Sequence, residues 1–414
     1  MTQTAKKESL RINGNRFWHR LMEMAKIGAT ANGGVCRVAL TDADKAGRDL
    51  FVHWCRAAGC EIDIDQMGNI FAQRPGENND LPPVLAGSHL DSQPTGGKFD
   101  GVYGVLAGLE IIETLNDSEI VTNRPVAVAS WTNEEGARFA PPMVASGVFA
   151  GVFDLAYGLS RADNENRTIG DELNRIGYAG NQPVGQRPIA VNFELHIEQG
   201  PVLEAAGKSI GVVTGVQGMR WYDLVIHGKP AHAGTTPMDR RTDPVMGAGA
   251  ILPQLYQVAH RFSPHARITF GSFKADPGVT NTVPGRLTIS IDLRHPDTEA
   301  LEQMDAEIRR IVHTECSRLG LVGRVDEKLY SKPVAFAPDC IQAVKKAVDQ
   351  LGIDAMDIIS GAGHDAVYIS KVAPTGMIFV PCKDGLSHNE AESITKADAE
   401  TGCNVLLHAI LHTM

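Results

Sequence analysis

The 414-residue chain is poor in aromatic residues and in basic charge, and it contains no long run of apolar residues. Its 39 lysines and arginines are outnumbered by 49 aspartates and glutamates, and the net charge of −10 argues against nucleic acid as a partner. Aromatic residues make up only 6%, so stacking platforms for bases are not expected. No segment reaches the ~18 apolar residues that a membrane span requires. The composition therefore predicts no nucleic-acid or membrane partner, but it permits a small anionic substrate that a local arginine or metal ion receives.

The seven cysteines form an odd, scattered set without a C-x-x-C pair. Such a set favours buried, reduced thiols over a disulfide framework, and it predicts a cytoplasmic setting. Residues 1–16 are polar and lack the apolar core of a signal peptide, so we expect none there.

With 43% apolar residues, the chain can bury a large core and is long enough for two domains. Apolar strands are predicted at 83–87 and 125–129, on either side of a helix over 102–115 with apolar residues at helical spacing. This β-α-β order predicts an α/β fold, with a mostly parallel sheet flanked by helices. A helix at 341–351 and a strand at 377–380 return to the same domain near the end of the chain.

The middle of the chain has a different pattern. Strands are predicted at 221–227 and 286–294, and the second alternates apolar and polar residues, as in an antiparallel sheet with one covered face. Helices are predicted at 243–259 and 298–319. We therefore expect a smaller α+β lid or dimerisation domain at 212–329, inserted into a catalytic domain formed by 1–211 and 330–414.

Six short segments carry acids or histidines at the spacing that a two-metal hydrolase needs. In open α/β sheets ligands bind beyond the carboxyl ends of strands, and two of these segments directly follow predicted strands. The segments are Gly87-Ser88-His89-Leu90-Asp91, Gly96-Gly97-Lys98-Phe99-Asp100-Gly101, Asn133-Glu134-Glu135-Gly136, Glu194-Leu195-His196-Ile197-Glu198-Gln199-Gly200, Gly361-Ala362-Gly363-His364-Asp365 and Ser387-His388-Asn389-Glu390.

Each segment alone has an ordinary explanation, such as a strand-end histidine, an Asp-Gly turn or a solvated acidic loop. His89 and Asp91 are two residues apart on extended chain, which suits an imidazole ligand held by a supporting carboxylate. The glycines before Asp100 allow a tight turn that brings its carboxylate close to another group. Adjacent Glu134 and Glu135 are costly after a buried strand unless a cation compensates them. Together with His196 on its strand and His388 near the C-terminus, these features make five coincidences that jointly favour a metal site.

These segments resemble the M20-type metallopeptidase superfamily, and specifically its hydantoinase/carbamoylase amidase branch. That branch includes N-carbamoyl-L-amino acid hydrolases, β-ureidopropionases and allantoate amidohydrolases. The similarity extends from about Met22 to Leu411, and its most specific strings are Gly87 to Gly101, Thr132 to Phe139, Glu194 to Gly200 and Ser360 to Ala366.

The resemblance implies roles for individual residues. It implies a two-metal centre with Asp100 as the bridging ligand, Glu134 as general base and His232 as a catalytic group that reaches the site of a dimer partner and stabilises an oxyanion. The carboxylate of Asp91 is expected to hold the ring nitrogen of His89 that does not bind metal. The implied metal ligands are His89, Asp100, Glu135, His196 and His388, and the implied substrate-binding residues are Gln199, Asn281, Arg294 and Gly363.

The function that follows is hydrolysis of an N-carbamoyl-L-amino acid to the amino acid, carbon dioxide and ammonia by a homodimeric enzyme. The substrate is a small anionic ureido acid, whose carboxylate the planar fork of Arg294 can clamp. Mixed carboxylate and imidazole ligands suit two Zn²⁺ ions, with Mn²⁺, Co²⁺ and Ni²⁺ as alternatives.

Other functions stay open at this point. Allantoate amidohydrolase or β-ureidopropionase activity would use the same chemistry on a different ureido acid. A peptidase or aminoacylase is less favoured, because such enzymes more often have an acid where His196 stands. A catalytically silent metal-binding scaffold would have lost the base or a ligand, and neither is missing. The glycines at 101, 104 and 108 lack the G-x-G-x-x-G and G-K-[ST] patterns of nucleotide sites, so we interpret them as helix-packing positions.

Overall fold

The computed structural model describes residues 8–414 and divides the chain into two compact units. One is formed by residues up to Thr214 together with Phe336–Met414, and the other by Gly215–Ala335. The second unit ends later than position 329, because the strand β12 (Val322–Ser331) stays paired with its neighbour through Ser331. The first seven residues of the polar segment 1–16, where no signal peptide is predicted, lie outside the described residues.

The first unit is built on a sheet with the strand order β1-β2-β4-β3-β5-β15-β6-β13, and β14 pairs with β6. The end of β6 and the two residues of β13 fall within the bounds of the second unit. The four central strands β4, β3, β5 and β15 are parallel. The strand β1 is antiparallel to β2, β2 to β4, and β6 to β15 and β13. This confirms the predicted α/β fold with a mostly parallel sheet. The strands are β1 (Glu61–Ile64), β2 (Ile70–Arg74), β3 (Val84–His89), β4 (Val126–Trp131), β5 (Val191–Ile197), β6 (Ile210–Val216), β13 (Val334–Ala335), β14 (Ala355–Ser360) and β15 (Thr375–Val380).

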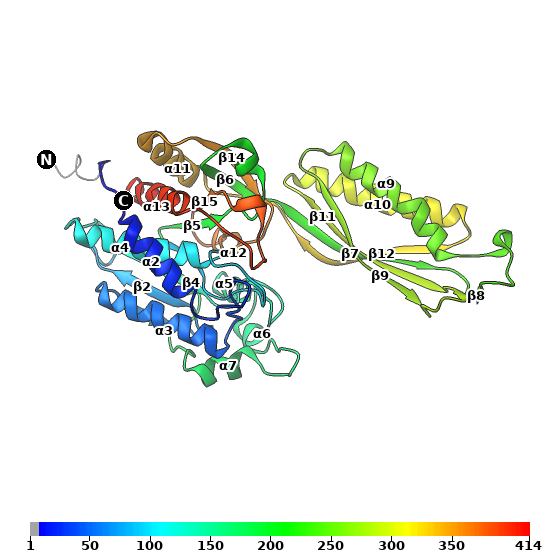
Figure 1. Ribbon diagram of the computed structural model, residues 1–414, viewed down its shortest axis with the longest axis horizontal. Coiled ribbons are helices and arrows are strands. Elements are labelled where there is room, and N and C mark those ends of the chain that lie inside the picture. Colours follow the sequence, from blue (N-terminus) through cyan, green and yellow to red (C-terminus); the bar gives the residue numbers. More distant parts are fainter. Residues whose placement is uncertain (1–7) are drawn as a thin grey trace. The chain divides into compact units, whose positions relative to one another are not determined.

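Helices cover both faces of this sheet. On one face α4, α11 and α13 pack on the central strands, with α2 against α4 and α13, and on the other face lie α5 and α12 (Figure 1). Since α4 lies between the sheet and other helices, it is apolar nearly all round. The helices are α2 (Gly14–Met24), α3 (Asp42–Ala57), α4 (Val102–Asp117), α5 (Val144–Phe149), α6 (Leu155–Leu159), α7 (Ile169–Ile176), α8 (Val202–Ala206), α11 (Pro338–Leu351), α12 (Asp365–Ile369), α13 (Lys396–Leu411) and the 3₁₀ turn η2 (Lys383–Gly385).

The second unit is a four-stranded antiparallel sheet of order β12-β7-β11-β9 with two helices on one face (Figure 1). The predicted alternation in β11 is confirmed, because Leu287, Ile289, Ile291 and Leu293 are buried against the helices. Its elements are β7 (Gly218–His227), β8 (Ala231–His232), η1 (Met238–Arg240), α9 (Pro244–Arg261), β9 (Arg267–Asp276), β10 (Thr282–Val283), β11 (Arg286–His295), α10 (Thr298–Arg318) and β12.

The structure bears on the predictions for the cysteines and for membrane-spanning segments. All seven cysteines are free, and six are buried as predicted, but Cys36 is exposed, between the buried residues Val35 and Arg37 on the loop before α3. Across residues 8–414 no helix is long and apolar enough to cross a membrane.

Candidate active site

The parallel strands bring the predicted site residues to one edge of the main sheet. His89 is the last residue of β3, His196 lies next to the end of β5, and Glu134 and Glu135 follow β4. Because β4, β3 and β5 are adjacent and parallel, their carboxyl ends meet. Asp100 stands immediately before the N-terminal end of α4, and His388 comes from the loop between η2 and α13.

Asp100 is shared by two clusters of candidate metal ligands. Its Oδ1 lies 3.1 Å from His196 Nε2 and 3.6 Å from His89 Nε2. Its Oδ2 lies 3.6 Å from His388 Nε2, and that nitrogen is 3.2 Å from Glu135 Oε2. The ligand atoms of His89, Asp100 and His196, and those of Asp100, Glu135 and His388, each lie within 4.8 Å of one another. This is the arrangement in which one carboxylate can bridge two cations.

The hydrogen bonds of the two buried histidines fit metal binding. His89 Nδ1 is 2.9 Å from the main-chain oxygen of Asp91, and His196 Nδ1 is 2.9 Å from that of Ile197. Since a carbonyl oxygen only accepts, both Nδ1 atoms carry a hydrogen, so a neutral ring at either position has its lone pair on Nε2. The Nε2 atom of His196 accepts the N–H of Gly101 at 3.2 Å. Both Nε2 atoms also lie near the carboxylate of Asp100, which is unfavourable unless a cation or a proton lies between them. The donor set therefore fits divalent metal ions.

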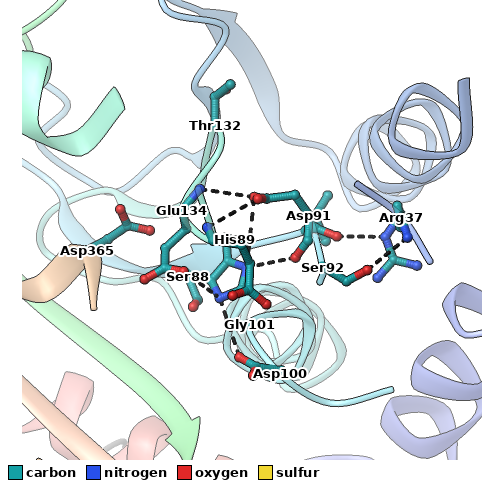
Figure 2. Close-up of polar contacts among 12 residues, drawn as sticks. Arg37, Ser88, His89, Asp91, Ser92, Asp100, Gly101, Thr132, Glu134 and Asp365 are labelled. Atoms are coloured by element: carbon teal, nitrogen blue, oxygen red, sulfur yellow. Dashed lines mark hydrogen bonds and ion pairs between the residues drawn. The ribbon is translucent and has the colours of Figure 1, made fainter. Parts of the chain in front are cut away.

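Asp91 supports the site differently from the prediction. The contact to the His89 ring comes from its main-chain oxygen, whereas its carboxylate Oδ1 is 3.9 Å from Nδ1. The carboxylate accepts the backbone N–H groups of Glu134 and Glu135, at 3.2 and 3.3 Å. Figure 2 shows Asp91 between Glu134 and the buried Arg37, whose Nε donates to the carbonyl of Leu90 at 2.6 Å. Asp91 thus fixes both the imidazole and the acidic pair.

Glu134 is buried beside the first cluster, with Oε2 3.6 Å from His89 Nε2. Burial raises the pKa of the Glu134 carboxyl well above its usual value, and the carboxyls of Asp365 and Glu135 add to this against the opposing effect of His89. Burial also raises the pKa of the Asp100 carboxyl, but His196 and His89 outweigh it and bring the pKa well below its usual value. One carboxyl is therefore suited to hold a proton, while the other stays ionised.

Several backbone positions at the site are held in the left-handed region. Asn133, Gln199 and His388 have φ values of 57°, 57° and 52°. Such conformations cost about 1–3 kcal/mol each and cluster at functional sites, because the surrounding structure must hold them. Gly101 has φ 70°, and a Cβ there would lie 2.3 Å from the His89 ring. This glycine therefore allows the start of α4 to approach the imidazole.

The remaining candidates of the first unit lie around the shared carboxylate. Gln199 Nε2 donates to Asp100 Oδ2 at 2.9 Å and to Ser387 Oγ at 3.0 Å, so the side chain of this predicted substrate contact is bonded to the carboxylate of Asp100. Gly363 precedes His364, whose ring is 4.6 Å from that of His196 between centroids.

The predicted residues of the second unit lie on two parts of it. His232 in β8 pairs with Thr282 in β10, and the carbonyl of Asn281 accepts the N–H of Ala233 at 2.9 Å, so His232 and Asn281 are neighbours. The Nδ1 atom of His232 accepts the N–H of Gly234 at 3.1 Å, which leaves its hydrogen on Nε2. Arg294, near the end of β11, is paired with Asp292 at 2.8 Å.

Sequence reasoning missed several buried polar groups around the centre. Glu194 accepts hydrogen bonds from Ser88 Oγ at 2.7 Å and from the N–H of Ala366 at 3.0 Å, and it thereby connects three segments. The carboxylate of Asp365 accepts a hydrogen bond from Ser146 Oγ, and its side chain faces Glu134 (Figure 2). Glu392 accepts the backbone N–H of Asp100. Glu194 and Asp365 lie inside two of the six acid- and histidine-containing segments, so their position there was the available signal.

Comparison with known proteins agrees with this geometry. Residues 85–412 match the family described as Peptidase family M20/M25/M40. The chain belongs to this family. The predicted resemblance is thereby confirmed, and the family is metal-dependent, which agrees with the two clusters of candidate ligands.

Within the family the chain is similar to amidohydrolases over its whole length. An N-carbamoyl-L-amino-acid amidohydrolase of Rhizobium meliloti is 48% identical over 98% of both chains. A crystal structure of an amidase of the hydantoinase/carbamoylase family from Burkholderia multivorans is 55% identical, with a TM-score of 0.94 over 98% of both chains. An allantoate amidohydrolase of Bacillus subtilis is 31% identical over 92% of this chain and 93% of its own length.

Proposed function

We propose that this protein is a binuclear-metal amidohydrolase that cleaves the carbamoyl group of N-carbamoyl-L-amino acids. The observation that carries the proposal is the pair of ligand clusters joined through Asp100, with the buried carboxyl of Glu134 beside His89. The identity to a named N-carbamoyl-L-amino-acid amidohydrolase, at 48%, supports this substrate class over allantoate, for which the similarity is 31%.

His89, Asp100 and His196 would hold one metal ion, and Asp100, Glu135 and His388 the other. Bound divalent cations supply Lewis acidity to a carbonyl oxygen and to water. Imidazole and carboxylate donors make Zn²⁺ the first candidate, with Mn²⁺, Co²⁺ and Ni²⁺ as alternatives.

Glu134 is the proposed general base. It takes the proton of the attacking water and delivers it to the leaving nitrogen, so that one carbamoyl amino acid and one water give the amino acid, carbon dioxide and ammonia. Its burial beside His89 and Asp365 supports this role, because a raised pKa makes the ionised carboxylate of Glu134 a stronger base.

We further propose that the substrate's acid end binds Arg294 and Asn281, and that Gln199 and the backbone at Gly363 complete its binding. His232 is the proposed oxyanion-stabilising group, and the second subunit of a homodimer supplies it. The enzyme is proposed to be cytoplasmic. The hydrogen on His232 Nε2 supports a donor role. Sedimentation of the intact protein tests the dimer, and a monomer at every concentration would contradict it.

A substrate panel tests the proposed activity directly. The protein is stripped of metal, reconstituted with each of the four cations and assayed for ammonia release from N-carbamoyl-L-amino acids, N-carbamoyl-β-alanine and allantoate. We expect the N-carbamoyl-L-amino acids to give the highest kcat/KM. Preference for allantoate or for the β-alanine derivative would assign the same chemistry to another substrate. Metal binding without turnover of any of them would indicate a scaffold.

A further inference from the structure

A buried glutamate outside the proposed ligand set holds the backbone of the shared ligand. Glu392 Oε1 accepts the N–H of Phe99 at 3.0 Å and the N–H of Asp100 at 3.1 Å. The residue is only 4% exposed, and it lies in the segment between η2 and α13. One carboxylate oxygen therefore fixes two successive peptide groups, the second of which belongs to the residue that joins the two clusters.

The turn before Asp100 is shaped to receive this carboxylate. A Cβ at Gly97 would lie 2.1 Å from the carboxyl carbon of Glu392, so only glycine permits the contact. The sequence predicts that the glycines bring a carboxylate close to another group, and the structure shows that the Glu392 carboxylate approaches Gly97 itself. The same segment also carries His388, so one stretch of chain supplies a ligand and fixes the backbone of another.

We propose that Glu392 is a positioning residue for Asp100 and thereby sets the affinity of the metal centre, an inference that rests on the metal site proposed above. Asp100 must direct Oδ1 toward His89 and His196 and Oδ2 toward His388 at the same time. A small rotation of its backbone would lose one of the two clusters. Two hydrogen bonds from successive peptide groups to one buried carboxyl oxygen are directional, and they oppose such a rotation.

In this proposal Glu392 acts through the position of its acceptor oxygen and not through its charge. Glu392→Gln keeps an acceptor oxygen at the same distance along the side chain, so it should bind metal close to the wild-type affinity. Glu392→Ala removes the acceptor, and Glu392→Asp withdraws it by one methylene group. Loss of a group that orients a metal ligand typically lowers metal affinity roughly 10–100-fold, and we expect a loss of this size for both variants.

The experiment is a Zn²⁺ titration of each metal-free protein in competition with a chromophoric chelator. The matched control is Glu110→Ala, because Glu110 is another fully buried glutamate that accepts a backbone N–H, that of Asn13 at 3.0 Å, and it lies outside the site. The control should lower the unfolding temperature and leave the Zn²⁺ affinity unchanged. If Glu392→Ala does not fold, the contrast between the Asp and Gln variants carries the test.

The outcomes separate the two proposals. A wild-type protein that binds no Zn²⁺ would refute the metal site itself. Binding by the wild type together with unchanged affinity in Glu392→Ala, or in Glu392→Asp, would refute only the positioning role. A Gln variant as weak as the Ala variant would also refute it, because the charge rather than the acceptor geometry would then decide affinity.

Discussion

A single carboxylate, Asp100, connects the parts of the candidate centre. It faces histidines that come from β3, from β5 and from the loop before α13, and its side chain and backbone are held by Gln199, Ser387 and Glu392. Its neighbour Gly101 fits against His89 without a side chain. At this scale the site depends on contacts that leave little freedom for substitution.

Replacing Glu134 with Gln tests the general base. The amide keeps the size of the side chain but cannot take a proton, so kcat for the carbamoyl substrate should fall by about 10²–10⁴-fold. Metal content, measured by elemental analysis, should equal that of the wild type, since Glu134 is not a proposed ligand. Wild-type turnover in this variant would show that another group accepts the proton.

Replacing Gly101 with Ala tests the fit against the His89 ring. Gly33→Ala is the matched control, because Gly33 also has a positive φ, of 88°, but a Cβ at that position would have no other atom within 4 Å. Both variants carry the backbone strain of an alanine at positive φ, which costs upwards of about 1 kcal/mol. In denaturant unfolding, Gly101→Ala should lose clearly more stability than the control and should also bind Zn²⁺ more weakly. Equal losses of stability in the two variants would show that the His89 ring can move away from the added methyl group at no energetic cost.

The turn between β1 and β2 contains a buried aspartate, Asp65, whose carboxyl is hydrogen-bonded within the turn. Asp65 accepts the N–H groups of Met67 and Asn69 at 2.9 and 3.0 Å, and also the side-chain amide of Asn69. Burial nevertheless raises the pKa of its carboxyl to about 6, against the lowering effect of these bonds. The turn therefore favours the protonated acid.

This predicts a pH dependence of stability that belongs to Asp65. A raised folded-state pKa contributes stability that is complete below the ordinary value of 3.8 and is lost as the pH rises through about 6. The free energy of unfolding of the wild type relative to Asp65→Asn should thus fall by about 3 kcal/mol between pH 3.5 and pH 7. Urea unfolding of both proteins across this range measures the difference. A constant difference would contradict the predicted titration.

The two units differ in the number of chain segments that form them. The second unit, Gly215–Ala335, is continuous, and its core is formed entirely by its own residues, from Tyr222 to Leu321. The first unit needs both of its segments, because β5 pairs in parallel with β15 from the far end of the sequence.

We expect the fragment 215–335 to fold on its own and the fragment 1–214 to fail. Circular dichroism and denaturant titration should show one cooperative transition for 215–335, and Leu301→Ala should lower its free energy of unfolding by about 2–5 kcal/mol, because Leu301 is fully buried in that core. A fragment 215–335 without a cooperative transition would show that its sheet needs the rest of the chain.

Local patterns determined the elements and much of the ligand set. The β-α-β order over 83–129 and the alternation in 286–294 reflect burial on one or both faces, which depends on residues near in sequence, and β3, α4, β4 and β11 follow them. His89, Asp100, Glu135, His196 and His388, singled out by motif and resemblance, lie together in the structure, although their roles as ligands remain predictions.

The tertiary structure decided which group contacts which. Sequence spacing suggested the carboxylate of Asp91 as the partner of His89, but the main-chain oxygen fills that place, because the carboxylate is taken by the amides of Glu134 and Glu135. The contact of Glu392 with the Asp100 backbone joins residues 292 positions apart, a separation that no local pattern reports. A sequence fixes the chemistry that each residue offers, whereas hydrogen-bond partners depend on distances that exist only once the sheet has brought remote segments together.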